Sequence, residues 1–136
     1  MKKFVTLLLC MLPISLFAQV NDGIRQAMDN YDYETVVTLI ESDCQDSLLL
    51  ITKAQALKAM NRYPEAIGVL NSLILKDSTN TKVLIDLAEC YKLTGNSRRA
   101  ANCYQKAMNL QPENKFFRLQ FIRSLLARSE ERRVGK

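Results

Sequence analysis

The chain has 136 residues, of which 48% are hydrophobic and 24% charged, and this permits one domain with an apolar core. Its formal net charge of +5 lies mainly at the ends, because Lys2 and Lys3 contribute +2 and residues 128–136 another +2, which leaves about +1 for the body. That balance gives no support for nucleic-acid binding. The chain has no histidine, which excludes the commonest general base and every Ser-His or Cys-His nucleophile pair.

Residues 1–18 are predicted to be a secretory signal peptide. Lys2 and Lys3 form a basic start, an apolar run extends from Phe4 to Phe17, and Ala18 precedes the expected cut. The run is shorter than the roughly 20 residues that span a bilayer, which favours cleavage over a permanent anchor. We therefore expect an exported protein, periplasmic or secreted, that meets the membrane only during export.

Residues 19–46 are predicted to form a degenerate first repeat, or N-terminal cap, made of two short helices. Apolar residues at helical spacing mark these helices: Ile24, Ala27 and Met28, then Val36, Val37, Leu39 and Ile40. A repeat protein needs an atypical terminal unit, because its first repeat has no neighbour on one side.

Residues 47–80 and 81–114 are predicted to be two copies of one helix pair. Apolar positions match at an offset of 34: Leu50 with Leu84, Ala54 with Ala88, Leu57 with Tyr91, Ala66 with Ala100, and Leu70 with Tyr104. Gly95, and Asn61 at the matching position, tolerate the left-handed conformation that ends a helix, and Asn96 and Ser97 can cap the next one. Each copy is therefore expected to contain two antiparallel helices joined by a tight turn.

This pattern resembles the tetratricopeptide repeat, with Leu84, Leu87, Ala88 and Tyr91 in the first helix, Ala100, Tyr104 and Ala107 in the second, and Pro112 at the end. The resemblance implies an all-α fold, a right-handed superhelical solenoid of antiparallel helix pairs. Residues 115–127 are then expected to be the first helix of a truncated further repeat, with Phe117, Phe121, Ile122 and Leu125 on one face. Residues 128–136 resemble a translated sequencing adapter and are interpreted as a non-native tail.

Cys90 and Cys103 are predicted to lie on the two antiparallel helices of one repeat. Export to an oxidising compartment would permit a disulfide between them. The alternative is that both are buried as small apolar side chains, which is common for free cysteine. The sequence leaves both open.

No motif in the sequence indicates catalysis or a cofactor. The glycines are isolated, so no phosphate-binding loop is present, and acidic pairs such as Asp86 with Glu89 are interpreted as solvated charges. We predict a non-enzyme with no cofactor and no metal.

The resemblance implies a concave groove lined by the first helices of successive repeats. By repeat position, the candidate partner-binding residues are Ile51, Gln55, Lys58, Lys82, Ile85, Glu89 and Lys92, with Leu48, Ala59 and Leu93 beside them. The isoleucines would form an apolar floor and the charged residues a polar rim, which suits a peptide segment. The alternative is that these residues are ordinary solvated helix faces. A Lys/Asn/Arg clamp for a peptide carboxylate is not expected, because Ile51, Gln55 and Asp86 occupy its positions.

The sequence therefore predicts a non-catalytic scaffold that binds a protein or peptide partner in this groove, outside the cytoplasm. One alternative is an exported N-terminal sensor or scaffold region of a larger regulator or enzyme. Another is a self-association module that uses the apolar face of Phe117, Phe121 and Leu125.

Overall fold

The computed structural model describes residues 19–40 and 44–135, so the predicted signal peptide lies outside the described residues. The chain divides into two compact units, Met1–Cys44 and Gln45–Lys136. In the first unit, a helix over residues 19–29 is followed by α2 (Tyr33–Leu39). Ile24, Ala27 and Val36 are buried in it. The side chain of Asp32 caps α2 by accepting a hydrogen bond from the backbone N–H of Thr35.

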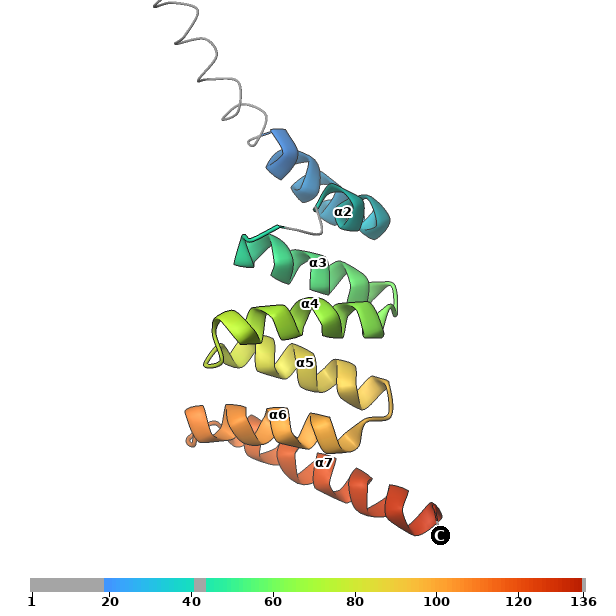
Figure 1. The fold of residues 1–136 in the computed structure, drawn as a ribbon, viewed down its shortest axis with the longest axis vertical. Coiled ribbons are helices and arrows are strands. Elements are labelled where there is room, and N and C mark those ends of the chain that lie inside the picture. The colour runs from blue at the N-terminus through green and yellow to red at the C-terminus, as the bar shows by residue number, and fades with distance from the viewer. Residues whose placement is uncertain (1–18, 41–43, 136) are drawn as a thin grey trace, which may run out of the picture. The chain divides into compact units, whose positions relative to one another are not determined.

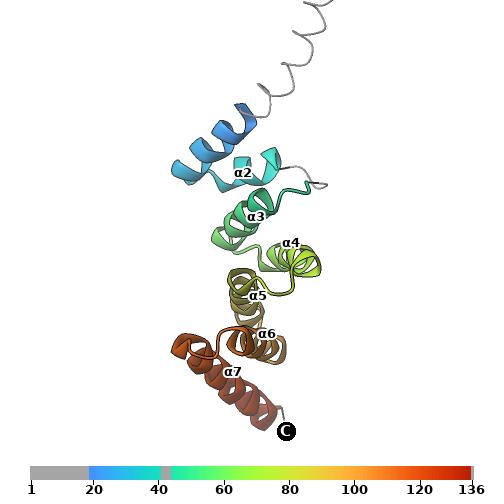
Figure 2. The ribbon, with the colours of Figure 1, turned by 90° about the vertical axis from the view of Figure 1, so that its left-hand side faces the viewer.

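The second unit is a row of antiparallel helices (Figure 1). They are α3 (Ser47–Ala59), α4 (Tyr63–Lys76), α5 (Thr81–Leu93), α6 (Ser97–Leu110) and α7 (Lys115–Val134). Each helix packs on the next along the chain. Within this unit α3, α5 and α7 lie on one side and α4 and α6 on the other (Figure 2). The described residues form helices and turns with no strand, so the predicted all-α fold is confirmed.

Three polar residues, spaced by the repeat length of 34 residues, begin the helices on the first of these sides. Asp46, Asn80 and Asn114 are the N-caps of α3, α5 and α7, and each side chain accepts a hydrogen bond from a backbone N–H of the first turn. Such caps satisfy donors that have no partner inside the helix. The repeated starting point aligns these helices with one another.

Left-handed residues end the helices at the predicted turns. Asn61 has φ 59° and Gly95 has φ 76°, which confirms the two turns expected from the sequence. Tyr31, between the helix over residues 19–29 and α2, adopts φ 59° as well. Sequence reasoning missed this position, because an aromatic residue rarely adopts the left-handed conformation.

Alanines at the helix crossings allow close packing in the core of the second unit. Ala54, Ala66, Ala88 and Ala100 are all at most 1% exposed. Small side chains let two helix axes approach to the short end of the usual range of about 8–10 Å. The larger buried side chains beside them include Leu57, Leu70, Leu84 and Tyr104.

The last helix is longer than predicted. α7 continues past Ala127 to Val134, through most of the segment interpreted as a tail. Its predicted apolar face is split: Phe117 is buried in a cluster with Leu84 and Ala107, whereas Ile122 and Leu125 are exposed. Packing on α6 and α5 therefore covers only part of this face. Among the described residues, no helix is long and apolar enough to cross a membrane.

Candidate functional site

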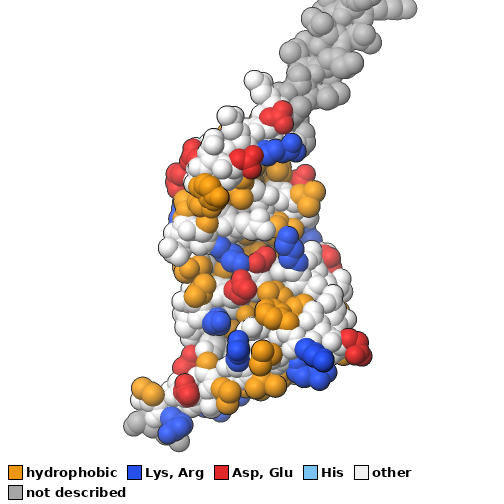
Figure 3. Space-filling model, turned by 180° about the vertical axis from the view of Figure 1, so that it is seen from behind, with side chains coloured by type: hydrophobic (Ala, Val, Ile, Leu, Met, Phe, Trp, Pro, Cys, Tyr) orange, Lys and Arg blue, Asp and Glu red, His pale blue; other side chains and the backbone are white. Residues whose placement is uncertain are grey.

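The candidate groove residues all lie on α3 and α5, on the side of the second unit opposite α4 and α6. Figure 3 shows this side, where basic, acidic and hydrophobic side chains are intermixed. Lys82 and Lys92 are exposed, whereas Ile51, Gln55, Lys58, Ile85 and Glu89 are partly buried. Apolar and charged candidate residues therefore both occur on these two helices.

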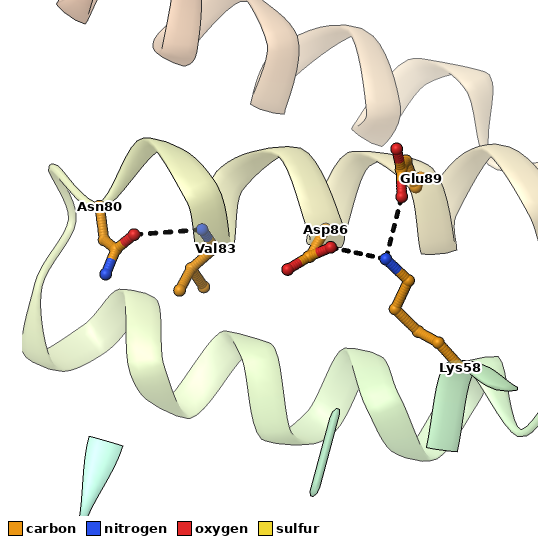
Figure 4. Close-up of polar contacts among 5 residues, drawn as sticks. All are labelled: Lys58, Asn80, Val83, Asp86 and Glu89. Atoms are coloured by element: carbon orange, nitrogen blue, oxygen red, sulfur yellow. Dashed lines mark hydrogen bonds and ion pairs between the residues drawn. The ribbon is translucent and has the colours of Figure 1, made fainter. Parts of the chain in front are cut away.

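Lys58 joins α3 to α5 through two carboxylates (Figure 4). Its Nζ atom donates hydrogen bonds to Oδ1 of Asp86 at 2.6 Å and to Oε2 of Glu89 at 2.9 Å. The side chains of Lys58 and Asp86 are only 20% and 17% exposed, and that of Glu89 is 43% exposed. We call these three residues the ion cluster. The ammonium group of Lys58 pairs with two carboxylates, so the ion cluster carries a net charge of −1.

The ion cluster changes the acidity of Lys58. Burial alone would lower the pKa of this ammonium, but the hydrogen bonds to Asp86 and Glu89 outweigh burial and raise the pKa above its ordinary value. Lys58 therefore stays charged and stays paired at neutral pH. It is held as a structural cation and is not a free clamp for an incoming carboxylate.

Sequence reasoning placed Lys58 and Glu89 in the groove but missed their partner Asp86. Asp86 was interpreted as a solvated charge, because its helix position gives no indication of a cation from the previous repeat. The repeat offset could not have found it, because an offset of 34 residues matches Lys58 to Lys92 and not to Asp86. The structure brings Lys58 and Glu89 together.

The side chain of Ile85 packs on the hydrophobic core of the second unit. It packs against the core cluster of Leu84, Ala107 and Phe117, so its position is fixed by residues from three helices. The partly exposed edge of such a residue offers a preformed apolar contact. The apolar floor at Ile85 stays a prediction, as do the groove positions of Gln55 and Lys92.

α7 lies on the same side of the second unit as α3 and α5, although no groove residue was predicted on it (Figure 2). At an offset of 34 from Lys82, Ile85, Glu89 and Lys92 lie Phe116, Leu119, Arg123 and Leu126. Phe116, Leu119 and Leu126 are exposed large hydrophobic residues. These residues were missed because only the face of Phe117, Phe121, Ile122 and Leu125 was considered on this helix.

The described residues contain no group of His, Cys, Asp and Glu side chains that could hold a metal ion. Cys90 and Cys103 are free and buried, so the structure contains no bridge between them. Burial raises the pKa of both thiols, which disfavours the reactive thiolate.

Stacked antiparallel helix pairs with repeated caps and turns define an all-α helical repeat protein. Residues 57–120 match the tetratricopeptide repeat family, which confirms the resemblance noted in the sequence.

Solved structures share this fold. The chain superposes on the first tetratricopeptide domain of Spaghetti (RPAP3) bound to an HSP90 peptide, with TM-score 0.66, 16% identity and coverage of 85% of this chain and 92% of that one. It superposes on the Yersinia enterocolitica type III secretion chaperone SycD in complex with a peptide of the translocator YopD, with TM-score 0.63, 17% identity and coverage of 90% and 96%.

Two further solved structures share this fold. PcrH from Pseudomonas aeruginosa, in complex with the chaperone binding region of PopB, gives TM-score 0.61 at 14% identity, with coverage of 83% of this chain and 94% of that one. The UNC-45 chaperone gives TM-score 0.68 at 18% identity over 85% of this chain, which spans only 14% of the UNC-45 chain. At these identities the comparisons establish a shared fold.

Proposed function

We propose that this protein is a non-catalytic scaffold, exported from the cytoplasm, that binds a peptide segment of a partner protein on the face of α3, α5 and α7. The observation that carries the proposal is the juxtaposition of partly buried Ile51 and Ile85 with exposed Lys82 and Lys92 on this face. Apolar floor and charged rim are the usual composition of a peptide groove.

The structural neighbours support a peptide as the ligand. Three of them were solved with a peptide or a binding region of another protein: an HSP90 peptide, a YopD peptide and a region of PopB. The fold is typical of non-catalytic scaffolds, and a peptide is the simplest ligand for an open face of this kind.

The ion cluster limits which part of a peptide can be recognised on this face. Lys58 is already paired with Asp86 and Glu89, so it does not offer a free cation for the terminal carboxylate of a peptide. We expect recognition through internal side chains: apolar residues on Ile51 and Ile85, and acidic residues near Lys82 and Lys92. The affinity should then fall with added salt, because exposed charge pairs are screened.

Binding is tested with peptides selected from a random display library on the immobilised protein. The dissociation constants of the selected peptides are measured by fluorescence anisotropy. We expect Ile51→Asp and the double variant Lys82→Glu/Lys92→Glu to weaken binding by at least about 10-fold. Leu75→Asp is the matched control, because Leu75 is 88% exposed on α4, on the opposite side. The proposed peptide groove would be refuted if Leu75→Asp weakened binding as much as the groove variants do. A library that yields no binding peptide would also refute it.

Export is tested separately. Residues 1–40 are fused to alkaline phosphatase, which is active only after it leaves a bacterial cytoplasm. A fusion that lacks residues 2–18 serves as the control. Equal activity of the two fusions would contradict the predicted signal peptide.

A further inference from the structure

Four of the predicted groove residues form a single stripe along α5. Lys82, Ile85, Glu89 and Lys92 follow one another at spacings of three, four and three residues, which places them on one face of the helix. At the helical rise per residue, Glu89 lies about 10.5 Å from Lys82 and about 4.5 Å from Lys92 along the axis. Charges of both signs therefore alternate over a length that one bound peptide can span.

The corresponding stripe of α3 offers a peptide little charge. At an offset of 34 residues it consists of Leu48, Ile51, Gln55 and Lys58, of which only Lys58 is charged. The ammonium group of Lys58 is already paired with two carboxylates of α5. The charges that remain for a ligand at the predicted groove positions of these two helices therefore belong to α5.

Glu89 carries the accessible part of the negative charge of the ion cluster. Asp86 makes the shorter contact with Lys58 and is only 17% exposed, whereas Glu89 is 43% exposed. Oε2 of Glu89 accepts the hydrogen bond from Lys58, and Figure 4 shows the other carboxylate oxygen pointing away from Lys58. Glu89 thus presents both an acceptor oxygen and uncompensated charge to a ligand.

Lys82 and Lys92 surround this carboxylate with the opposite charge. Both lysines are exposed, and neither forms an ion pair with another residue in the described part of the chain. A uniformly acidic peptide would be repelled at Glu89, and a uniformly basic peptide would be repelled at the two lysines. The stripe therefore favours a peptide of mixed charge.

We infer that the peptide bound in this groove carries a lysine or arginine that pairs with Glu89, between acidic residues that pair with Lys82 and Lys92. This ligand chemistry rests on the proposed function, because it concerns the same groove. An apolar side chain next to the basic residue would pack on Ile85. Glu89 is then a specificity-determining residue for the partner, whereas the neutral Gln55 at the matching position of α3 selects no charge.

Selection from a random peptide display library tests this pairing on the full chain and three variants. Glu89→Gln removes the charge and keeps the shape of the side chain, and Glu89→Lys inverts the charge. Glu65→Gln is the matched control, because Glu65 is also a partly exposed glutamate paired with a cation, but lies on α4. We expect lysine and arginine to be enriched at one position of the peptides selected on the unaltered protein and on Glu65→Gln. The enrichment should disappear on Glu89→Gln and change to aspartate and glutamate on Glu89→Lys.

Dissociation constants of one peptide selected on the unaltered protein are then measured by fluorescence anisotropy. Glu89→Gln, and replacement of the basic residue of the peptide by glutamine, should each weaken binding by at least about 5-fold. Both changes together should weaken it no more than either alone. Lys58→Met should tighten binding, because it leaves the two carboxylates of the ion cluster without their cation. A substitution that destabilises the fold but tightens binding distinguishes recognition of charge from a merely structural role.

Two outcomes would overturn the pairing with Glu89 and leave the groove intact. In the first, Ile51→Asp weakens binding of the selected peptides, but these peptides show no enriched basic residue. In the second, Glu89→Gln and Glu65→Gln change their affinity equally. If no peptide is selected, or if Ile51→Asp leaves binding unchanged, the proposed function fails and the pairing fails with it. Selection of acidic peptides on Glu89→Lys also excludes a folding artefact, since an unfolded variant would select no peptide of defined charge.

Discussion

The Nζ atom of Lys58, near the end of α3, lies 2.6 Å from Oδ1 of Asp86 in the middle of α5. This ion pair, extended by Glu89, connects the first helices of two successive helix pairs directly, on the face proposed to bind peptides. Both side chains are more than three quarters buried, so solvent screens the pair less than an ordinary surface ion pair.

Lys58→Met should destabilise the protein by roughly 1–2 kcal/mol, because it leaves the largely buried carboxylate of Asp86 without its cation. Chemical denaturation followed by circular dichroism measures the change. A double-mutant cycle with Asp86→Asn should give a coupling energy of about 1 kcal/mol. Glu65→Gln is the control, since it breaks the exposed Arg62–Glu65 pair and should destabilise the protein less than Lys58→Met does. Additive effects of Lys58→Met and Asp86→Asn would show that the ion pair contributes nothing.

The free energy of unfolding should fall as the pH rises from about 10 to about 12. Burial raises the pKa of Tyr104 from 10.0 to about 12, and the ion cluster raises the pKa of Lys58. Groups with a higher pKa in the folded state bind more protons there than in the unfolded state within this window, so stability is lost as the pH rises through it. Tyr104 alone should account for about 2–3 kcal/mol.

Urea unfolding at a series of alkaline pH values tests this dependence, and tyrosinate absorbance in the folded protein follows the phenol. Tyr104→Phe should make the curve less steep, because it removes one of the titrating groups. An identical slope in the variant would show that the loss of stability has another origin.

Substitution of two glycines should give effects of opposite sign. Gly95→Ala should destabilise the protein by about 1–2 kcal/mol, because φ is 76° at this turn and a Cβ atom is strained there. Gly68→Ala should stabilise it by roughly 0.5–1 kcal/mol, because Gly68 lies inside α4 with open space where the methyl group of alanine would lie, and alanine favours helix. Thermal melts measure the change in melting temperature of each variant. A shift of the melting temperature in the same direction for both would contradict the assigned backbone conformations.

Ala88→Leu should destabilise the protein by roughly 1–3 kcal/mol, the usual cost of overpacking. Ala88 is 0% exposed at the crossing of α5 with its neighbours, so a larger side chain must push the helices apart. Ala59→Leu is the control: Ala59 is exposed at the end of α3, and the change should stay within about 0.5 kcal/mol. Unchanged melting of Ala88→Leu would place this residue away from the crossing.

The sequence by itself determined the features that depend on local chemistry. Helical spacing identified the buried stripe of Leu84, Leu87, Ala88 and Tyr91, and the tolerance of Asn and Gly for left-handed backbone identified the turns at Asn61 and Gly95. These predictions succeeded because period and turn conformation are set within a few residues of the chain.

The tertiary structure alone decided which side chains meet across repeats. It paired Lys58 with Asp86, which no local pattern indicates, because the partners are on different helices and their contact depends on how α3 and α5 stack. It also buried Phe117 and left Ile122 and Leu125 exposed. Apolar spacing predicts a face to bury, but the packing of α7 on α6 determines which part of that face is covered.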